Sequence, residues 1–378
     1  MSTIRDTDLV RTNDYAEDSG EVRVLDPDGR VLPGATVPDL SDDALVTMYE
    51  AMKTARRFDD RAVSWQRQGR LATYAPMSGQ EAGQVASTLA LSDDDWVFPT
   101  YREHAVRLVA GFDLPEILRG LMGAELPCGS ADGPTVAPEA IPIASQIPHA
   151  TGAAMAAGHR GDESVALAHF GDGATSEGDF HEALNVAGVF DAPAVFCCHN
   201  NQWAISVPRN RQTASATLAG KARAYGFEGV RVDGMDPLAV YSVVRYAREK
   251  ALDPDPEDLR PTLVESVEYR YGAHTTADDP DVYRDDDEVA YWRDRDPIDR
   301  LETFLLETGR LDAETVDAVD SRVDERVADA IAEAESRTAP EVDDVFEHVQ
   351  ADLPPRAVEQ REYLRRLRDR HGDALLRE

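Results

Sequence analysis

The stretch from residue 166 to residue 201 constrains the fold more than any other part of the sequence. Two apolar runs, Val165–Phe170 and Ala194–Cys198, lie on either side of a segment whose apolar residues recur at helical spacing. A strand, a helix and a strand within roughly thirty residues form a βαβ unit, whose strands are parallel and joined by a right-handed crossover. Helical patterns such as Pro237–Ala251 and apolar runs such as Thr262–Val267 continue the alternation. The sequence therefore predicts an α/β fold, a doubly wound and mostly parallel sheet flanked by helices.

Polar residues follow both strands of this unit. Asp172 lies between two glycines after the first strand, where glycine would let the chain turn tightly, and Asn201 follows the second. The carboxyl ends of parallel strands meet at one edge of an open sheet, where ligands bind. A carboxylate, an amide oxygen and a main-chain carbonyl near Trp203 would form an oxygen-only ligand set that suits Mg²⁺. Amides after Gly173 would favour a diphosphate there. A tight turn followed by a polar loop is the structural alternative.

The Gly-Asp-Gly and Asn-Asn motifs at this spacing are similar to the sequence signature of thiamine diphosphate-binding proteins. With the surrounding sequence, the chain resembles the alpha subunit of the decarboxylating component of 2-oxo acid dehydrogenase complexes, from about Val22 to about Arg365. The further stretches that carry the resemblance are Ser78–Ala82, Pro99–His104, Ser145–Pro148, Val232–Tyr241 and Arg270–Thr276.

The resemblance implies thiamine diphosphate and Mg²⁺ as cofactors. It assigns the metal to Asp172, Asn201 and Trp203. The Tyr101-Arg102 pair would grip the diphosphate, because arginine offers a planar fork of donors. The implied cofactor contacts are Tyr101, Arg102, Ile141, Ile143, Asp172, Gly173, Ala174, Asn201, Trp203 and His274. Backbone near Ile141 and Ile143 would touch the aminopyrimidine ring, and a K⁺ ion near Ser145 and Gln146 is left open.

His274 is the catalytic residue that the resemblance implies. It lies in a polar loop, where a histidine is ordinarily only solvated. Placed beside the diphosphate and the substrate, a side chain with a near-neutral pKa would donate a hydrogen bond or a proton. His104 is expected to be structural.

The implied activity is oxidative decarboxylation of a 2-oxo acid, with acyl transfer to the lipoyl group of a separate acyltransferase. Pyruvate is the first choice of substrate, and a branched-chain 2-oxo acid dehydrogenase or an acetoin dehydrogenase alpha subunit are the alternatives. The acid that activates the aminopyrimidine would come from a beta subunit, in an α2β2 assembly. A non-catalytic subunit that only shapes a complex is a competing hypothesis, which the combination of Arg102, Asp172, Asn201 and His274 argues against.

The length and composition indicate the domain organisation and the cellular environment of the protein. The 378 residues allow one large α/β domain at 41–310, between an N-terminal arm at 1–40 and a helical C-terminal region at 311–378. The sequence contains no run of 18 apolar residues, so no membrane span is expected. The three cysteines show no metal-ligand spacing, and Cys197 and Cys198 are expected to be buried thiols in a reducing cytoplasm.

The charge is strongly acidic. The net charge is −33, from 72 acidic and 39 basic residues, and the acids are scattered along the chain. Nucleic-acid binding would need a basic face and is not expected. The 42% of apolar residues argue against disorder. An acidic surface that carries only Lys53, Lys221 and Lys250 as lysines predicts a halophilic, archaeal-type protein.

We expect the protein to lose structure in dilute buffer and to regain it in molar potassium chloride. Repulsion among the acidic groups acts over ~30 Å at 0.01 M ionic strength but over only ~3 Å at 1 M. The melting temperature, followed by circular dichroism as the salt is raised, should therefore increase. A melting temperature that is flat or falls would contradict the halophilic interpretation.

Overall fold

The computed structural model describes residues 11–12, 20–336, 341–347 and 349–372. The chain divides into two compact units, 1–331 and 332–378. Most of the acidic arm expected at 1–20 lies outside the described residues. The domain boundaries expected after residues 40 and 310 stay predictions.

The larger unit is built on a sheet that has eight strands among the described residues, in the order β1-β2-β9-β10-β6-β5-β3-β4. Neighbours from β2 to β4 are parallel, and β1 is antiparallel to β2. The strands are β1 (Arg11–Thr12), β2 (Glu21–Val22), β3 (Trp96–Phe98), β4 (Thr135–Val136), β5 (Ala166–Gly171), β6 (Ala194–Asn200), β9 (Glu228–Asp233) and β10 (Thr262–Val267). The predicted doubly wound, mostly parallel α/β fold is confirmed.

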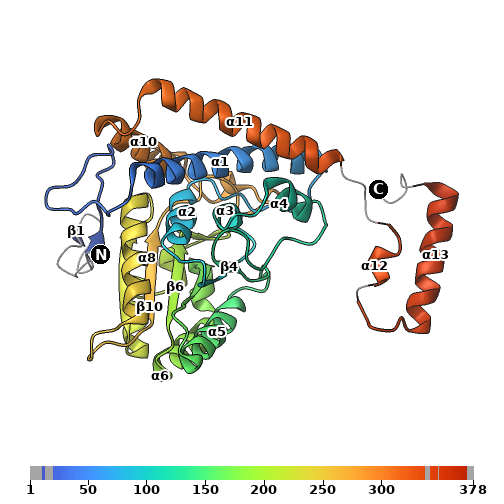
Figure 1. Cartoon of the computed structure of the whole chain (residues 1–378), viewed down its shortest axis with the longest axis horizontal. Coiled ribbons are helices and arrows are strands. Elements are labelled where there is room, and N and C mark those ends of the chain that lie inside the picture. Colours follow the sequence, from blue (N-terminus) through green and yellow to red (C-terminus); the bar gives the residue numbers. More distant parts are fainter. Residues whose placement is uncertain (1–10, 13–19, 337–340, 348, 373–378) are drawn as a thin grey trace. The chain divides into compact units, whose positions relative to one another are not determined.

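Helices alternate with these strands (Figure 1). They are α1 (Asp42–Arg67), α2 (Glu81–Leu89), α3 (His104–Val109), α4 (Leu114–Leu121), α5 (Gln146–Arg160), α6 (Gly178–Val189), α7 (Arg209–Gln212), α8 (Pro237–Leu252), α9 (Asp286–Arg293), α10 (Pro297–Glu307) and α11 (Ala313–Ser336). Short 3-10 helices are η2 (Asp172–Ser176), η3 (Ala219–Tyr225) and η4 (Pro280–Val282).

The predicted βαβ unit is β5, α6 and β6. Its strands pair in parallel, with Ala166 opposite Ala194. Every residue of β6 is buried, which explains why the strand is an unbroken apolar run and lacks the alternation of a half-exposed strand. Cys197 and Cys198 are buried free thiols, as predicted, and Cys128 is exposed.

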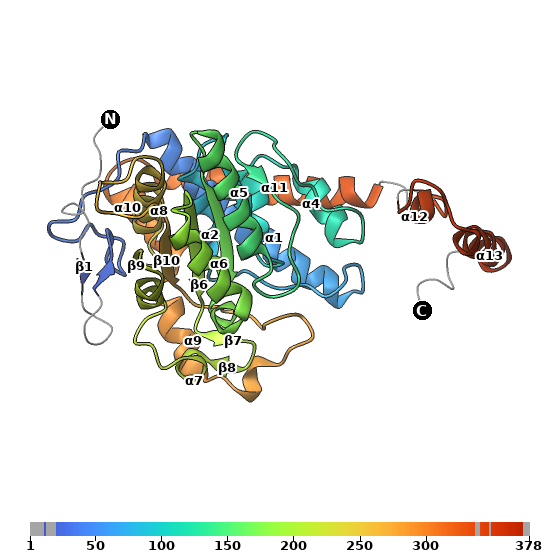
Figure 2. The same cartoon turned by 90° about the horizontal axis from the view of Figure 1, so that it is seen from below.

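Different helices cover the two faces of the sheet. Phe196 and Cys198 of β6 pack into an apolar cluster with residues of α5 and α6. Because successive side chains of a strand alternate, Cys197 and His199 point to the opposite face. There α2 approaches so closely that a Cβ on Gly83 would lie 3.1 Å from the His199 ring. Figure 2 shows the sheet edge-on among these helices, with β7 (Trp203–Ala204), β8 (Val207–Pro208), α7 and α9 grouped together.

The first long helix, α1, begins with a capping residue. Ser41 caps it, its hydroxyl accepting from the amide of Ala44 at 3.2 Å, and two aspartates occupy the first turn. Its apolar face is buried. Ion pairs join α1 to α11, which lies along it in Figure 1: Lys53–Asp320, Arg57–Asp324 and Glu50–Arg322.

A buried carboxylate on α1 anchors the loop at 74–78. Asp59 accepts from the hydroxyl of Tyr74 and from the amide of Met77, each at 2.8 Å. Within this loop the carbonyl of Pro76 accepts from the guanidinium of Arg102. By fixing this loop, Asp59 helps to hold Arg102, a residue of the predicted cofactor site, in place.

The segment at 120–142 is largely a loop. It also contains β4, which pairs in parallel with β3. A strand of two residues has no periodicity to detect, so the sequence could not reveal it.

The C-terminal region that was expected to be helical contains α11, in which Val319, Val323 and Val327 are buried. The smaller unit contains α12 (Asp344–Glu347) and α13 (Pro355–His371). Within it, Arg365 pairs with Asp343. Among the helices described, none combines the length and apolar character needed to cross a bilayer.

Candidate functional site

Polar residues follow the carboxyl ends of four neighbouring strands. The strands β10, β6, β5 and β3 are adjacent and parallel, so their carboxyl ends share one edge of the sheet. The residues placed there are Tyr101 and Arg102 after β3, Asp172 after β5, Asn201 and Trp203 after β6, and Arg270 and His274 after β10. Residues far apart in sequence thus meet at the position where open α/β sheets bind ligands.

All of these residues except Arg270 line a pocket of about 270 Å³. Of the predicted cofactor contacts, it is lined by Tyr101, Arg102, Ile143, Asp172, Gly173, Ala174, Asn201, Trp203 and His274. Ile141 is not among the lining residues and is 70% exposed. The structure therefore brings nine predicted residues together, while their roles toward a cofactor stay predictions.

Asp172 is a buried carboxylate in this pocket. The side-chain amide of Gln212 donates to its Oδ2 at 2.8 Å. Burial raises the pKa of Asp172 to about 6, although the Gln212 hydrogen bond and the charge of Arg270 oppose the shift. The raised pKa indicates a carboxylate whose surroundings do not fully compensate its charge, and a bound cation would stabilise its ionised form.

Asn201 lies beside two other polar groups of the pocket. Its Nδ2 donates to Gln80 Oε1 at 3.0 Å, and its Oδ1 accepts from the Trp203 amide at 3.3 Å. The other atom of the Gln80 amide, Nε2, is buried and has no hydrogen-bond partner among the described residues. Oxygen atoms from Asp172 and Asn201 with an unused buried donor nearby fit Mg²⁺ and an anionic group.

The glycines around Asp172 are explained differently from the expectation of a tight turn. Neither has a positive φ. A Cβ on Gly173 would lie 2.9 Å from the Cβ of Ala204, so this glycine permits the close approach of β7. Gly171 has no neighbouring atom within 4 Å of such a Cβ, and the structure gives no steric reason for it.

Three non-glycine residues near the pocket have left-handed backbone conformations. Ala144 and Ile205, with φ of 68° and 56°, line the pocket, and Gln202, with φ of 74°, lies between Asn201 and Trp203. Such a conformation is strained for a β-branched residue such as Ile205, and strained residues often mark functional sites.

His274 is held between two arginines. Its Nδ1 lies 3.1 Å from Arg102 Nη2 and 3.2 Å from Arg270 Nη1. Because guanidinium groups only donate, Nδ1 is the acceptor and the ring proton is on Nε2. Burial and the charges of Arg102 and Arg270 lower the pKa of His274 to about 4. The expectation of a near-neutral pKa is therefore wrong, and the ring is neutral at physiological pH.

The sequence analysis did not assign Gln80, Gln212 or Arg270 to the site. Gln80 and Arg270 lie within stretches that carry the family resemblance, and that was a usable signal. Arg270 also donates from Nη2 to the carbonyl of Ile205 at 2.9 Å. Nothing in the sequence around Gln212 indicates that it would reach Asp172, 40 residues earlier.

Two further histidine and glutamine predictions can be placed. His104 is not among the pocket-lining residues and stacks on Tyr74 with ring centroids 4.9 Å apart, while burial lowers its pKa to about 3. Both features agree with the structural role expected for it. Gln146 donates to the carbonyl of His169 at 2.6 Å, and its Oε1 is buried without a partner among the described residues.

Comparison with known proteins accounts for this arrangement. Residues 49–343 match the family model described as "Dehydrogenase E1 component". The chain is 46% identical over 333 residues to the 3-methyl-2-oxobutanoate dehydrogenase subunit alpha of Mycobacterium tuberculosis (strain CDC 1551 / Oshkosh), covering 86% of this chain and 88% of that protein. It is 41% identical over 355 residues to the pyruvate dehydrogenase E1 component subunit alpha of Staphylococcus aureus (strain Mu50), covering 93% and 94%. The chain therefore belongs to the dehydrogenase E1 component family.

Proposed function

We propose that this protein is the alpha subunit of a 2-oxo acid dehydrogenase and carries out thiamine diphosphate-dependent oxidative decarboxylation. The observation that carries the proposal is the pocket that brings Asp172 and Asn201 together with Arg102 and His274. Arg270 contacts this site through its hydrogen bond to His274. Membership of the dehydrogenase E1 component family supports it. When bound, thiamine diphosphate supplies the nucleophilic carbon and the electron sink for loss of carbon dioxide.

The chain's own residues would hold the cofactor. Asp172, Asn201 and the main-chain carbonyl of Trp203 would hold Mg²⁺, because hard oxygen ligands suit this ion. Tyr101 and Arg102 lie in the loop after β3, the strand next to β5, and would bind the diphosphate. The 3-10 helix that starts at Asp172 brings the amides of Gly173 and Ala174 to the pocket lining. A K⁺ ion near Ser145 and Gln146 is a weaker proposal, supported by the unpaired Gln146 Oε1.

His274 orients the reacting group. With Nδ1 occupied by the two arginines, Nε2–H is a hydrogen-bond donor of fixed direction. A neutral imidazole can donate this hydrogen bond throughout the physiological pH range, since its pKa is lowered to about 4. His274 therefore positions the substrate as a neutral donor.

Pyruvate is the proposed substrate, in agreement with the S. aureus relative named as a pyruvate dehydrogenase subunit. A branched-chain 2-oxo acid is the alternative, favoured by the M. tuberculosis relative named for 3-methyl-2-oxobutanoate. Acetoin is a third candidate. Comparing kcat/KM of the assembled complex on these three compounds decides among them.

The proposed partners are a beta subunit, in an α2β2 assembly, and a lipoyl-bearing acyltransferase. Two carboxylates besides Asp172 line the pocket. Glu103 accepts from the amide and hydroxyl of Thr100, and Glu177 is exposed. Neither is a free buried acid for the aminopyrimidine, which supports an acid from a second subunit.

The Asp172→Ala variant should lose Mg²⁺-dependent binding of thiamine diphosphate, because the cation loses its charged protein ligand. Asn201→Ala should weaken binding less, since it removes a neutral ligand. Asp179→Ala, which removes an exposed acid seven residues along, is the matched control and should bind normally. Calorimetry on the assembled complex measures all three. Wild-type affinity in Asp172→Ala would remove the metal assignment.

The His274→Ala variant should bind thiamine diphosphate nearly as well as the wild type but turn over roughly 10²-fold more slowly, because the positioned donor is gone. Pyruvate-dependent reduction of an artificial electron acceptor measures turnover. His159→Ala, an exposed histidine at the end of α5, is the control and should keep full activity. Unchanged turnover in His274→Ala would exclude a role in the reaction.

A further inference from the structure

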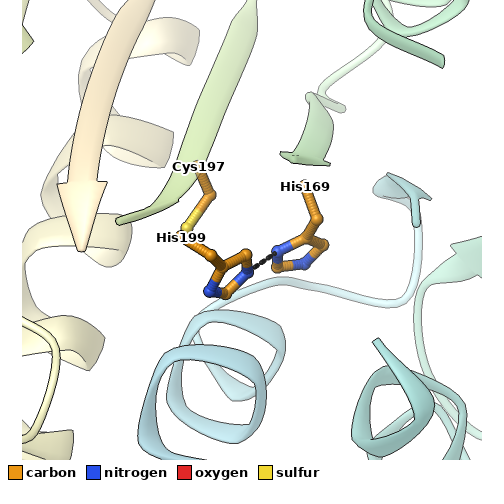
Figure 3. A group of neighbouring side chains, drawn as sticks. All are labelled: His169, Cys197 and His199. Carbon is orange, nitrogen blue, oxygen red and sulfur yellow. Dashed lines mark hydrogen bonds between the residues drawn. The ribbon is translucent and has the colours of Figure 1, made fainter. Parts of the chain in front are cut away.

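A second group of side chains that can bind a metal ion lies on the face of the sheet that α2 covers. His169 of β5 and Cys197 of β6 are register partners, and His199 lies two residues after Cys197. Period-two alternation therefore points Cys197 and His199 to the same face. All three residues are buried, and one ligand atom from each lies within 4.8 Å of the others (Figure 3).

We propose that His169, Cys197 and His199 form a site for a thiophilic cation, with Zn²⁺ as its ligand. The set of two imidazole nitrogens and one sulfur differs from the oxygen-only set of Asp172 and Asn201. Nitrogen and sulfur select Zn²⁺, whereas Mg²⁺ prefers oxygen. The two sites should therefore take different ions.

A carboxylate already orients one of the imidazoles. His199 Nδ1 lies 3.0 Å from Glu268 Oε1, and the Ser266 hydroxyl donates to Glu268 Oε2 at 3.1 Å. Metal-ligating histidines typically donate their second ring nitrogen to a carboxylate in this way. The contact turns His199 Nε2 toward His169, as Figure 3 shows.

The facing ring nitrogens are close to the separation that an ion requires. His169 Nδ1 and His199 Nε2 are 2.9 Å apart and share one hydrogen bond. Two nitrogens bound tetrahedrally to zinc at about 2.0–2.1 Å lie about 3.4 Å apart, so the rings need to separate by only about half an ångström. Burial lowers the pKa of His169 well below its usual range, so this ring is neutral. The Glu268 carboxylate raises the pKa of His199 against the effect of burial, so an ion must also displace a proton from His199.

Proton and charge balance are consistent with a divalent ion. In the ion-bound form Nδ1 of His169 carries no proton, and the ring proton lies on Nε2, which is buried and has no partner among the described residues. The Cys197 thiol and the protonated His199 ring each lose one proton to solvent as their bonds to zinc form. Zn²⁺, one thiolate and the Glu268 carboxylate then sum to zero charge.

The position of the site suggests its use. His169 and His199 precede Asp172 and Asn201 by three and two residues on adjacent strands. An ion there would link β5 to β6 directly below the residues that hold the cofactor. His199 also lines the cofactor pocket, which offers a route from solvent.

The test uses the assembled complex, treated with a chelator, loaded with Zn²⁺ and then washed with Mg²⁺ and thiamine diphosphate to clear the oxygen site. Plasma mass spectrometry should find about one zinc per alpha chain. Cys197→Ser and His169→Asn should each lose it. Cys198→Ser is the matched control, because Cys198 faces the apolar cluster on the other side of the same strand, and it should keep zinc.

A Co²⁺-loaded complex supplies the second measurement. It should show a thiolate-to-cobalt charge-transfer absorption that Cys197→Ser removes and Cys198→Ser retains, with melting temperatures confirming that each variant is folded. If a variant fails to fold, the wild-type zinc content and cobalt spectrum still decide. Wild-type protein that retains no zinc, or equal loss in Cys197→Ser and Cys198→Ser, would overturn the proposal. Either result can occur with full decarboxylase activity, so it is distinguishable from failure of the proposed function.

Discussion

Parallel pairing of β3, β5, β6 and β10 is the constraint on which the site depends. Each strand is short and largely buried, and a polar residue follows each of them at the same edge of the sheet. Asp172 and Asn201 are therefore neighbours without any direct bond between them in the described structure. A shift in register would turn buried apolar side chains toward the opposite face, so the core and the site are fixed by the same pairing.

The same edge concentrates charges that the protein alone balances poorly. Arg102 and Arg270 both face Nδ1 of His274, and burial together with Arg102 lowers the pKa of Arg270 to about 10. Asp172, in the same pocket, has a pKa that burial raises to about 6. An anionic diphosphate beside the arginines and a cation at Asp172 would relieve both. These charges are therefore suited to a ligand that carries both an anionic and a cationic group, and without such a ligand they destabilise the folded protein.

The sequence predicts much of this arrangement for physical reasons that can be named. The apolar runs of β5 and β6 and the periodicity of α1 and α11 follow from burial, and the motif stretches located nine residues of the pocket. Gln212 reaches Asp172 through tertiary packing, which no local pattern encodes. The lowered pKa of His274 results from burial and from the charges of Arg102 and Arg270, and only the fold brings these groups around the ring. Likewise, spacing alone gave no metal pattern for Cys197, because His169 comes from another strand.

We propose that this chain supplies the residues that bind the diphosphate and the metal ion, and that a second subunit completes the active site. The most direct measurement is the pyruvate-dependent reduction of an artificial acceptor by this chain alone, saturated with thiamine diphosphate and Mg²⁺ in high salt, before and after the beta subunit is added. We expect no turnover from the chain alone and turnover once the second subunit is present. Full activity from a homo-oligomer of this chain would contradict the account.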